Sequence, residues 1–398
     1  MVTASPDFKQ RQLTVQKAMQ AEGLSALVAY GLSSYAGSGS NAHGYIRYLT
    51  GWTARFAASM LLLPAEGSPT LLVPGAHDVL YAKQSFPWVE RCLAEAPRNY
   101  GSLCRRILLD WGCQKVGLVG IGEMPHPIYQ DLVGKADGCT FTPADAIIDA
   151  LRLTKDPVEI AYHRQAAAIS DQMLSVLRDR LSSFRGPARK LVAEMEYTGR
   201  SMGAEIATCW LVTGQPADRP HYRLEENERE VQDGDQVLVG TYVTYRGYWA
   251  HCLRMGSVGS PSEQYRRTYE AAINQHRAAA AQIRPGNDAR QIQAEAIRAA
   301  EEAIPGSLNN AVWFRQAHFM GLDYAEKPSS AFPQPENWTQ NKGSKPNEVI
   351  LRPGMLLEVH TNLGGAGGVG FGVVGDTYLV TEDGAERITG FPQELFEA

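Results

Sequence analysis

The sequence predicts two domains, an α/β domain over residues 1–153 and an α+β domain over residues 154–398. The chain has 398 residues, which is long enough for two hydrophobic cores. In the first part, helical and strand patterns alternate, which indicates a mixed sheet covered by helices. In the second part, two helical segments, a set of strands, two further helical segments and a strand-rich end follow one another.

The elements of the first domain follow from periodicity and turn residues. An amphipathic helical pattern ends at Gly23 and is followed by an apolar strand. Three further segments are predicted as strands, the second of which contains a hairpin turn of sequence AEGSP. Two later segments have helical spacing. The strands are predicted at residues 25–31, 45–52, 58–75 and 115–120, and the helices at residues 7–23, 99–112 and 126–136.

The second domain begins with a long helical pattern, and the domain boundary is placed just before it. Asp156, Pro157 and Glu159 stand in its first turn, where a proline and acidic residues suit the positive end of a helix. Further helical patterns cover residues 189–203, 262–283 and 288–303. The last ~90 residues are rich in strand patterns that glycine and proline interrupt.

Composition excludes several classes of partner. Charged residues make up 20% of the chain and the net charge is −5, so a nucleic acid or an anionic membrane is not expected to bind. No apolar run approaches the ~20 residues that span a bilayer. The polar start lacks the charged-then-apolar order of a signal peptide, and the six cysteines follow no disulfide framework. We therefore expect a cytoplasmic protein with reduced thiols.

Four blocks of the second domain carry the residues that suggest chemistry. They read GDQVLVGTYVTYRGYWAHCLR from residue 234, AHFMGLDYAEKP from 317, LRPGMLLEVH from 351 and GDTYLVTEDGAERIT from 375. Together they resemble the pita-bread superfamily of creatinase, prolidase and aminopeptidase P. The resemblance implies a creatinase-like N-terminal domain and a pita-bread catalytic domain.

In the hydrolases of that superfamily, two aspartates, one histidine and two glutamates hold two metal ions. The resemblance places these five ligands at Gly240, His251, His318, His360 and Gly375. Because the bridging carboxylates are lost, we do not expect two metals. The three histidines are instead candidate ligands of one divalent transition metal, Fe, Zn or Mn.

Other polar residues extend this candidate site. Glu358 stands two residues before His360 on a predicted strand, so it points to the same face and is a candidate fourth ligand or general base. His221 matches a histidine that moves protons in the superfamily. Where the peptidases carry a second histidine before a glutamate, this chain has Ala325 before Glu326, which argues against Xaa-Pro peptide hydrolysis. Glu326 is also a candidate substrate-binding residue.

A metal-free site is the alternative, because creatinase and ectoine hydrolase resemble the same frame and work without metal. His251 and His360 would then transfer protons or bind the substrate. In the first domain, the sequence HGYIRYLTGWTARF resembles a segment that reaches the active site of the neighbouring protomer in creatinase-like enzymes. The resemblance therefore implies a homodimer, and the candidate substrate-binding residues of this segment are Arg47, Trp52, Arg55 and Phe56.

The function expected from these residues is hydrolysis of a non-peptide C–N bond in a small amide, amidine or cyclic amino-acid derivative. One alternative is a mononuclear three-histidine iron oxygenase or lyase that acts on a small carboxylate. Another is a protein that resembles an Xaa-Pro peptidase and has no peptidase activity. Neither GxGxxG nor GxxxxGK[ST] occurs, so no nucleotide cofactor is expected.

Overall fold

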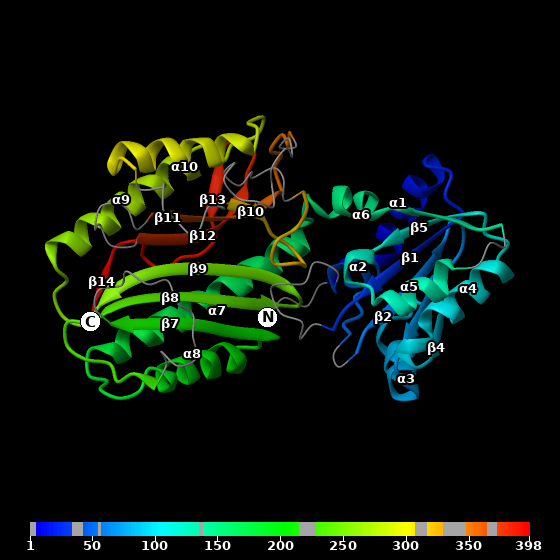
Figure 1. The fold of residues 1–398 in the computed structure, drawn as a ribbon, viewed down its shortest axis with the longest axis horizontal. Coiled ribbons are helices and arrows are strands. Elements are labelled where there is room, and N and C mark those ends of the chain that lie inside the picture. The colour runs from blue at the N-terminus through cyan, green and yellow to red at the C-terminus, as the bar shows by residue number, and fades with distance from the viewer. Residues whose placement is uncertain are drawn as a thin grey trace. The chain divides into compact units, whose positions relative to one another are not determined.

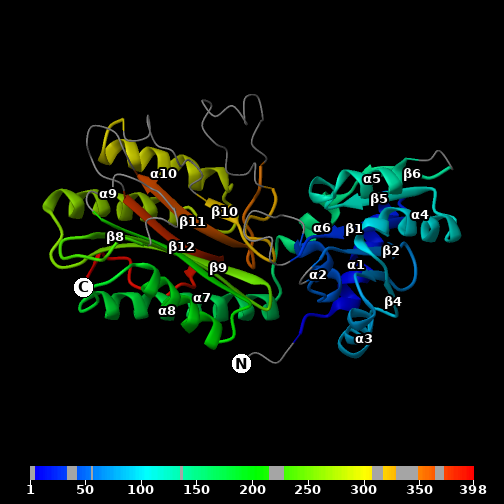
Figure 2. The same ribbon diagram turned by 60° about the horizontal axis from the view of Figure 1, so that its bottom comes forward.

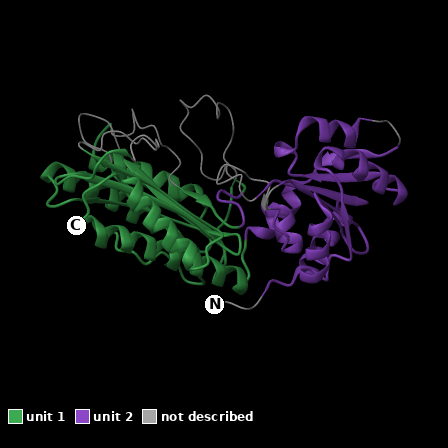
Figure 3. Cartoon of the chain, turned by 90° about the horizontal axis from the view of Figure 1, so that it is seen from below, with its two compact units in different colours: residues 1–2, 154–321, 327–398 green, residues 3–153, 322–326 purple. Residues whose placement is uncertain are grey.

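The computed structural model describes residues 5–33, 43–54, 57–134, 138–214, 228–306, 317–328, 348–363 and 372–398. The chain divides into two compact units, coloured separately in Figure 3. The C-terminal unit contains residues 1–2, 154–321 and 327–398, and the N-terminal unit contains residues 3–153 and 322–326. The short segment 322–326 therefore belongs to a unit whose other residues all precede residue 154.

The N-terminal unit is an α/β domain around a six-stranded mixed sheet, as the sequence predicts. Its strand order is β4-β3-β2-β1-β5-β6, with antiparallel pairs β1–β2 and β2–β3 and parallel pairs β1–β5, β5–β6 and β3–β4. The strands are β1 (Ala26–Gly31), β2 (Ser59–Pro64), β3 (Thr70–Val73), β4 (Arg91–Ala94), β5 (Lys115–Val119) and β6 (Thr140–Pro143). The helices are α1 (Phe8–Ala21), α2 (His43–Thr50), α3 (Ala76–Ser85), η2 (Pro97–Asn99), α4 (Tyr100–Asp110), η3 (Ile121–Glu123), α5 (His126–Val133) and α6 (Asp145–Arg152).

The predicted strand at residues 45–52 is wrong, because most of this segment forms helix α2. The aromatic and β-branched residues of this segment favour a strand in isolation. In the fold, Tyr45, Ile46 and Leu49 are all at most 2% exposed, and this spacing is that of a buried helical face. Gly51 ends the helix with a φ of 77°.

The C-terminal unit contains an eight-stranded sheet with helices packed against it (Figures 1 and 2). The main strand order is β10-β11-β12-β9-β8-β7, and all five neighbouring pairs are antiparallel. These strands are β7 (Ile206–Gly214), β8 (Gln236–Tyr245), β9 (Tyr248–Ser257), β10 (Ala317–Phe319), β11 (Leu356–Leu363) and β12 (Gly372–Val380), and the short β13 (Ala385–Arg387) and β14 (Phe396–Glu397) pair with β12 and β9.

Three helices pack against the strands of this sheet, and a fourth, α10, packs against α9. Helices α7 and α8 pack against β7, β8 and β9, and α9 packs against β11 and β12. The helices are α7 (Pro157–Leu181), α8 (Arg189–Ser201), α9 (Glu263–Ala280) and α10 (Arg290–Ala303). At the start of α7, Asp156 and Glu159 form a capping box with Pro157 in the first turn, which confirms the predicted helix start. Among the described residues, no helix combines the length and the apolar character needed to cross a bilayer.

Candidate active site

One face of the eight-stranded sheet carries a row of five side chains on five neighbouring strands. The backbone register pairs Tyr242 with His251, His251 lies beside Thr377, Thr377 pairs with Glu358, and Glu358 pairs with His318. Directly opposed residues in antiparallel strands point to the same face, so the five side chains share one side of the sheet. The antiparallel register therefore brings together residues that are up to 135 positions apart in the sequence, the separation of Tyr242 and Thr377.

Glu358 is the centre of this row. Its side chain is 0% exposed, its Oε2 lies 2.7 Å from His318 Nε2, and its Oε1 lies in close contact with His251 Nδ1. Neither carboxylate oxygen has a hydrogen-bond donor of good geometry among the described residues. Burial alone would raise the pKa of this carboxyl, but the imidazoles of His251, His360 and His318 hold the pKa well below its usual range. Glu358 is therefore a buried anion that positive charge must balance.

His318 has one ring nitrogen fixed by the backbone. Its Nδ1 lies 3.0 Å from the carbonyl oxygen of Phe319, and because a carbonyl only accepts, this nitrogen carries the proton. The other nitrogen, Nε2, is the one that faces Glu358. In the neutral ring, Nε2 would point a lone pair at a carboxylate oxygen, which is favourable only when a proton or a metal cation lies between the two atoms.

His251 is held on two sides. Its ring stacks on Tyr242 with centroids 4.3 Å apart and planes inclined by 23°. Its backbone N–H donates to Thr377 Oγ1 at 3.1 Å, and the Thr377 hydroxyl donates to the His251 carbonyl at 3.0 Å. The ring is therefore fixed beside Glu358 by packing and by the strand backbone.

The donors that converge most closely are those of His318, Glu358 and His360. One ligand atom from each lies within 4.8 Å of the other two, and the His318 and His360 rings are 5.7 Å apart. Two imidazoles and one carboxylate are ligands that zinc, iron and manganese accept, so these residues fit one divalent metal. The group includes Glu358, which the sequence offered as a fourth ligand, and the role of His251 as a ligand stays a prediction.

The resemblance places two further ligands at Gly240 and Gly375. Neither residue could carry a methyl group unless a neighbouring side chain moved. A Cβ built on Gly240 would lie 2.4 Å from two ring carbons of Trp210, and a Cβ built on Gly375 would lie 2.7 Å from Leu253 Cδ1. Both neighbours are side chains of the same sheet face, since Trp210 pairs with Gly240 and Leu253 pairs with Gly375. The residues present therefore do not fit a second metal.

The other candidate residues from the sequence are distributed as follows. His221, Arg55 and Phe56 lie outside the described residues. Trp52 is 4% exposed, donates from Nε1 to Ser59 Oγ at 2.9 Å and packs against aromatic rings of α3 and the following loop, so it is a core residue of the N-terminal unit. Arg47 lies in the last turn of α2 and is half-buried.

Glu326 belongs to a buried charge cluster that sequence reasoning missed. It accepts a hydrogen bond from the Leu322 N–H at 3.0 Å and lies 3.7 Å from Arg152 Nε. Arg152, which is 2% exposed, also contacts Asp323 at 2.5 Å and Asp149 at 3.0 Å. These ion pairs anchor the segment that follows His318 to the N-terminal unit. Only the tertiary structure brings helix α6 beside residues 322–326, so no sequence pattern indicates the cluster.

A second buried network lies on the helix-covered face, directly behind Gly375. Asp376 is 0% exposed and receives hydrogen bonds from Arg254 Nη2 at 2.6 Å, Thr389 Oγ1 at 2.7 Å and Gln393 Nε2 at 2.8 Å. Arg254 Nη1 also donates to the Gly375 carbonyl at 2.7 Å. Burial would raise the pKa of Asp376, but the Arg254 guanidinium and the His276 imidazole lower it. The network fixes β12 against β9 beneath the site.

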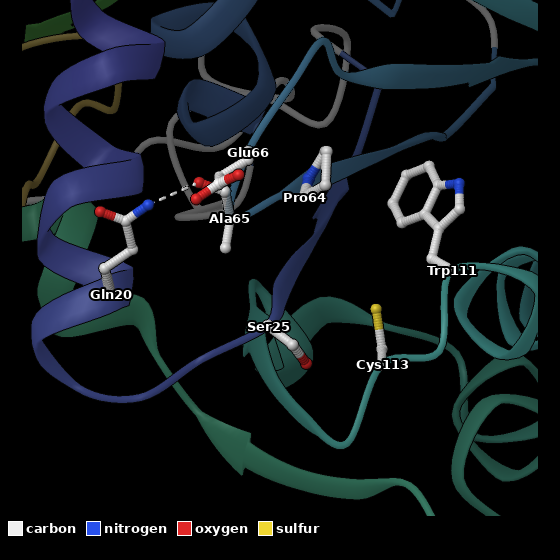
Figure 4. A pocket seen from close by; sticks show the side chains of 7 residues that line it. All are labelled: Gln20, Ser25, Pro64, Ala65, Glu66, Trp111 and Cys113. Carbon is white, nitrogen blue, oxygen red and sulfur yellow. Dashed lines mark hydrogen bonds between the residues drawn. The ribbon is translucent and has the colours of Figure 1, made fainter.

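A surface hollow in the N-terminal unit has a different character (Figure 4). It is lined by Gln20, Ser25, Pro64, Ala65, Glu66, Trp111 and Cys113. Burial raises the pKa of the Cys113 thiol, so this group is less reactive than a free thiol. The hollow therefore offers no group comparable to the histidine and glutamate cluster.

Comparison with known proteins agrees with this arrangement. A profile described as metallopeptidase family M24 matches residues 161–382, which is more than half of the chain. The chain belongs to metallopeptidase family M24. A second profile, the creatinase/prolidase N-terminal domain, matches residues 11–154. The superfamily resemblance and the two-part fold class predicted from the sequence are confirmed.

Individual relatives of this M24 family member are distant in sequence. An Xaa-Pro dipeptidase of Pyrococcus horikoshii is 25% identical over 354 residues, covering 88% of this chain and 91% of the relative. An ectoine hydrolase of Halomonas elongata is 26% identical over 323 residues, covering 75% and 74%. The solved structure of an Xaa-Pro dipeptidase from Bacillus anthracis superposes with a TM-score of 0.78 at 21% identity, covering 98% of this chain and all of the other. This last likeness shows the pita-bread fold.

The function expected from the sequence is corrected by these comparisons. The prediction that the chain hydrolyses a non-peptide C–N bond is wrong. The Pyrococcus horikoshii relative, which covers more of the chain than the ectoine hydrolase does, is named a dipeptidase. The oxygenase or lyase alternative and the alternative without peptidase activity are corrected with it. The sequence argument against peptide hydrolysis rested on Ala325, which stands where the peptidases carry a histidine. The lost carboxylate ligands bear on the number of metals, and a single Lewis acid suffices to polarise an amide carbonyl.

Proposed function

We propose that this chain hydrolyses the peptide bond of a dipeptide-sized substrate with one divalent metal held by His318, Glu358 and His360. The observation that carries the proposal is the convergence of these three donors within 4.8 Å around a buried carboxylate. The M24 family is a family of metallopeptidases, and the Pyrococcus horikoshii relative is a dipeptidase by name.

The side chains that fill the space above Gly240 and Gly375 favour one metal over two. Trp210 and Leu253 occupy the space above Gly240 and Gly375, where two further carboxylate ligands would have to stand. Two cations a few ångströms apart also need several carboxylates to offset their repulsion. Glu358 is the one carboxylate in the group of described residues that could hold a metal.

The charge of the site supports a bound cation. The Nε2 of His318 faces Glu358 Oε2 at 2.7 Å while its Nδ1 proton is committed to the Phe319 carbonyl. A proton on Nε2, or a cation held by both residues, would remove the repulsion between the imidazole lone pair and the carboxylate. When bound, the metal would act as a Lewis acid on the substrate carbonyl and would lower the pKa of water.

The chain's own residues would position and neutralise the reacting groups. His318 keeps its tautomer through Phe319, which directs Nε2 into the site. His251, stacked on Tyr242 and in contact with Glu358, would hold a proton at Nδ1 against the carboxylate. His221 stays a candidate for proton transfer to the leaving amine. A cytoplasmic homodimer, in which Arg47, Arg55 or Phe56 contacts the substrate of the partner, is a further part of the proposal.

Metal analysis combined with dipeptide hydrolysis tests this proposal. The purified protein should contain about one equivalent of metal and should hydrolyse dipeptides. Replacing a ligand should cost more than the ~10–100-fold that outer-shell partners of metals cost, so Glu358→Gln should lose the metal and at least ~100-fold in kcat/KM. His126→Ala is the matched control, since this histidine is exposed on α5. Two bound equivalents, or undiminished hydrolysis by Glu358→Gln, would contradict the proposal.

A further inference from the structure

Strand β11 carries a buried side-chain amide directly beyond His360. Asn362 stands two residues after His360, so both side chains point to the same face of the strand. Asn362 is 4% exposed and pairs with Val373, which is 1% exposed. Burying an amide in apolar surroundings is costly unless hydrogen bonds replace those that it makes with water. The contacts of this amide therefore bear on why a polar residue stands here.

The Asn362 amide contacts the imidazole of His360. Its Nδ2 lies 3.2 Å from His360 Nδ1 and 3.3 Å from the His360 carbonyl oxygen. Because a carbonyl oxygen only accepts, the second contact favours the NH2 end of the amide on this side. The Nδ1 atom of His360 is engaged by Asn362, so Nε2 is the ring nitrogen left for a metal.

His318 is held at the same ring position by a different group. Its Nδ1 lies 3.0 Å from the Phe319 carbonyl oxygen, and its Nε2 faces Glu358 Oε2 at 2.7 Å. Metal-binding imidazoles usually donate the other ring N–H to an oxygen, which fixes the ring and raises the basicity of the ligand. The main chain supplies this oxygen to His318, whereas the partner of His360 is a side chain that substitution can change.

We infer that Asn362 is the positioning residue of His360, which it holds at Nδ1 so that Nε2 can bind the metal with His318 and Glu358. This inference rests on the proposed metal-dependent hydrolysis and adds the residue that sets metal affinity. A metal on Nε2 requires the ring proton at Nδ1, so the amide must then accept it at Oδ1. A half-turn about the terminal torsion of Asn362 supplies this oxygen, because that torsion is roughly two-fold and the two ends of the amide are similar in size.

Zinc affinity, measured by competition with a chromogenic chelator, tests the inference. Asn362→Leu keeps a side chain of similar size but removes every hydrogen-bonding group from it. Loss of such a partner weakens metal binding by about 10–100-fold, and we expect a loss in that range. Asn362→Asp keeps an acceptor for the Nδ1 proton and should bind zinc at least as tightly as the wild type. Its recovery would separate the hydrogen bond from packing.

Thr361→Val is the matched control. Thr361 lies between the two residues on the opposite face of β11, where its Oγ1 is 3.4 Å from the carbonyl oxygens of Ala272 and Val374. This variant also removes a buried hydrogen-bonding group, but it should leave zinc affinity unchanged. Urea unfolding in excess chelator shows whether each variant folds, and Asn362→Ala replaces Asn362→Leu if the leucine prevents folding.

The visible absorption of the cobalt-loaded proteins gives a second readout, because it responds to the geometry of the donors. The wild type and Asn362→Asp should share a spectrum that differs from that of Asn362→Leu, whereas a purely structural role would leave all three alike.

The outcomes separate this inference from the proposed function. If Asn362→Leu and Asn362→Ala keep wild-type zinc affinity, or if Asn362→Asp fails to restore a lost affinity, the inference is overturned, and dipeptide hydrolysis by the wild type leaves the proposed function standing. If Asn362→Leu weakens zinc binding and Asn362→Asp restores it, the inference is supported even when no dipeptide is hydrolysed and the proposed function fails. A wild type that binds no divalent metal overturns both.

Discussion

The residue at position 210 should decide whether a methyl group at position 240 stabilises or destabilises the protein. A Cβ on Gly240 would lie 2.4 Å from Cε2 and Cζ2 of Trp210, well inside the ~3.5–4.0 Å of an ordinary carbon contact. The ring would have to move by at least ~1 Å, and overpacking of this kind costs about 1–3 kcal/mol. Gly240 has no left-handed φ, so an alanine fits its backbone and restricts the unfolded chain, which contributes about 0.4–1 kcal/mol.

We therefore expect opposite signs in two backgrounds. Gly240→Ala should lower the free energy of unfolding by up to about 1–3 kcal/mol in the wild type and should raise it by about 0.4–1 kcal/mol in Trp210→Ala. The difference between the two effects is the coupling energy of a double-mutant cycle. Urea unfolding of the four proteins, followed by far-ultraviolet circular dichroism, measures it.

A glycine without neighbours provides the control for this cycle. A Cβ on Gly122 would meet no atom within 4 Å, so Gly122→Ala should have the same effect in both backgrounds. If Gly240→Ala also has the same effect in both backgrounds, the indole does not lie over Gly240. The argument against a second metal would then lose its basis.

Three further outcomes are expected from buried charges. Asp376→Asn should cost about 3–5 kcal/mol in urea unfolding because it leaves Arg254, which is 0% exposed, without its carboxylate. Because folding lowers the pKa of Asp376, its carboxylate stabilises the fold above the unfolded pKa near ~3.9, and this stabilisation is lost as the pH falls below that value. The difference in the free energy of unfolding between the wild type and Asp376→Asn should therefore become smaller from pH 6 to pH 3. A difference that stays constant would refute this. Arg152→Met should also destabilise by about 3–5 kcal/mol, because three buried carboxylates lose their cation, and a cost below ~1 kcal/mol would show that they are protonated. Thermal melts should show that added zinc or manganese raises the Tm of the wild type and of His126→Ala but not that of Glu358→Gln.

The sequence was sufficient to predict the helices and strands whose ends are defined by local capping and turn residues. The start of α7 at Pro157 and the strands on both sides of the AEGSP turn are formed as predicted, because caps and turn residues act locally. Residues 45–52 were mispredicted because burial in the N-terminal core outweighs the strand preference of their side chains.

The candidate site was predictable only along single strands. Glu358 and His360 are two residues apart, so period-two alternation places both on one face of β11. The contacts of Glu358 with His251 and His318 depend on the register of β9, β10, β11 and β12, which no local pattern specifies. The packing of Trp210 over Gly240 was missed for the same reason.

The position of residues 322–326 also affects where the chain can be divided. Arg152 meets Asp149 within its own helix, but its other two carboxylates, Asp323 and Glu326, arrive about 170 residues later in the sequence. A fragment that stops at residue 153 would therefore enclose a guanidinium with one counter-ion in place of three. During synthesis, the N-terminal unit cannot complete its core until most of the chain has left the ribosome.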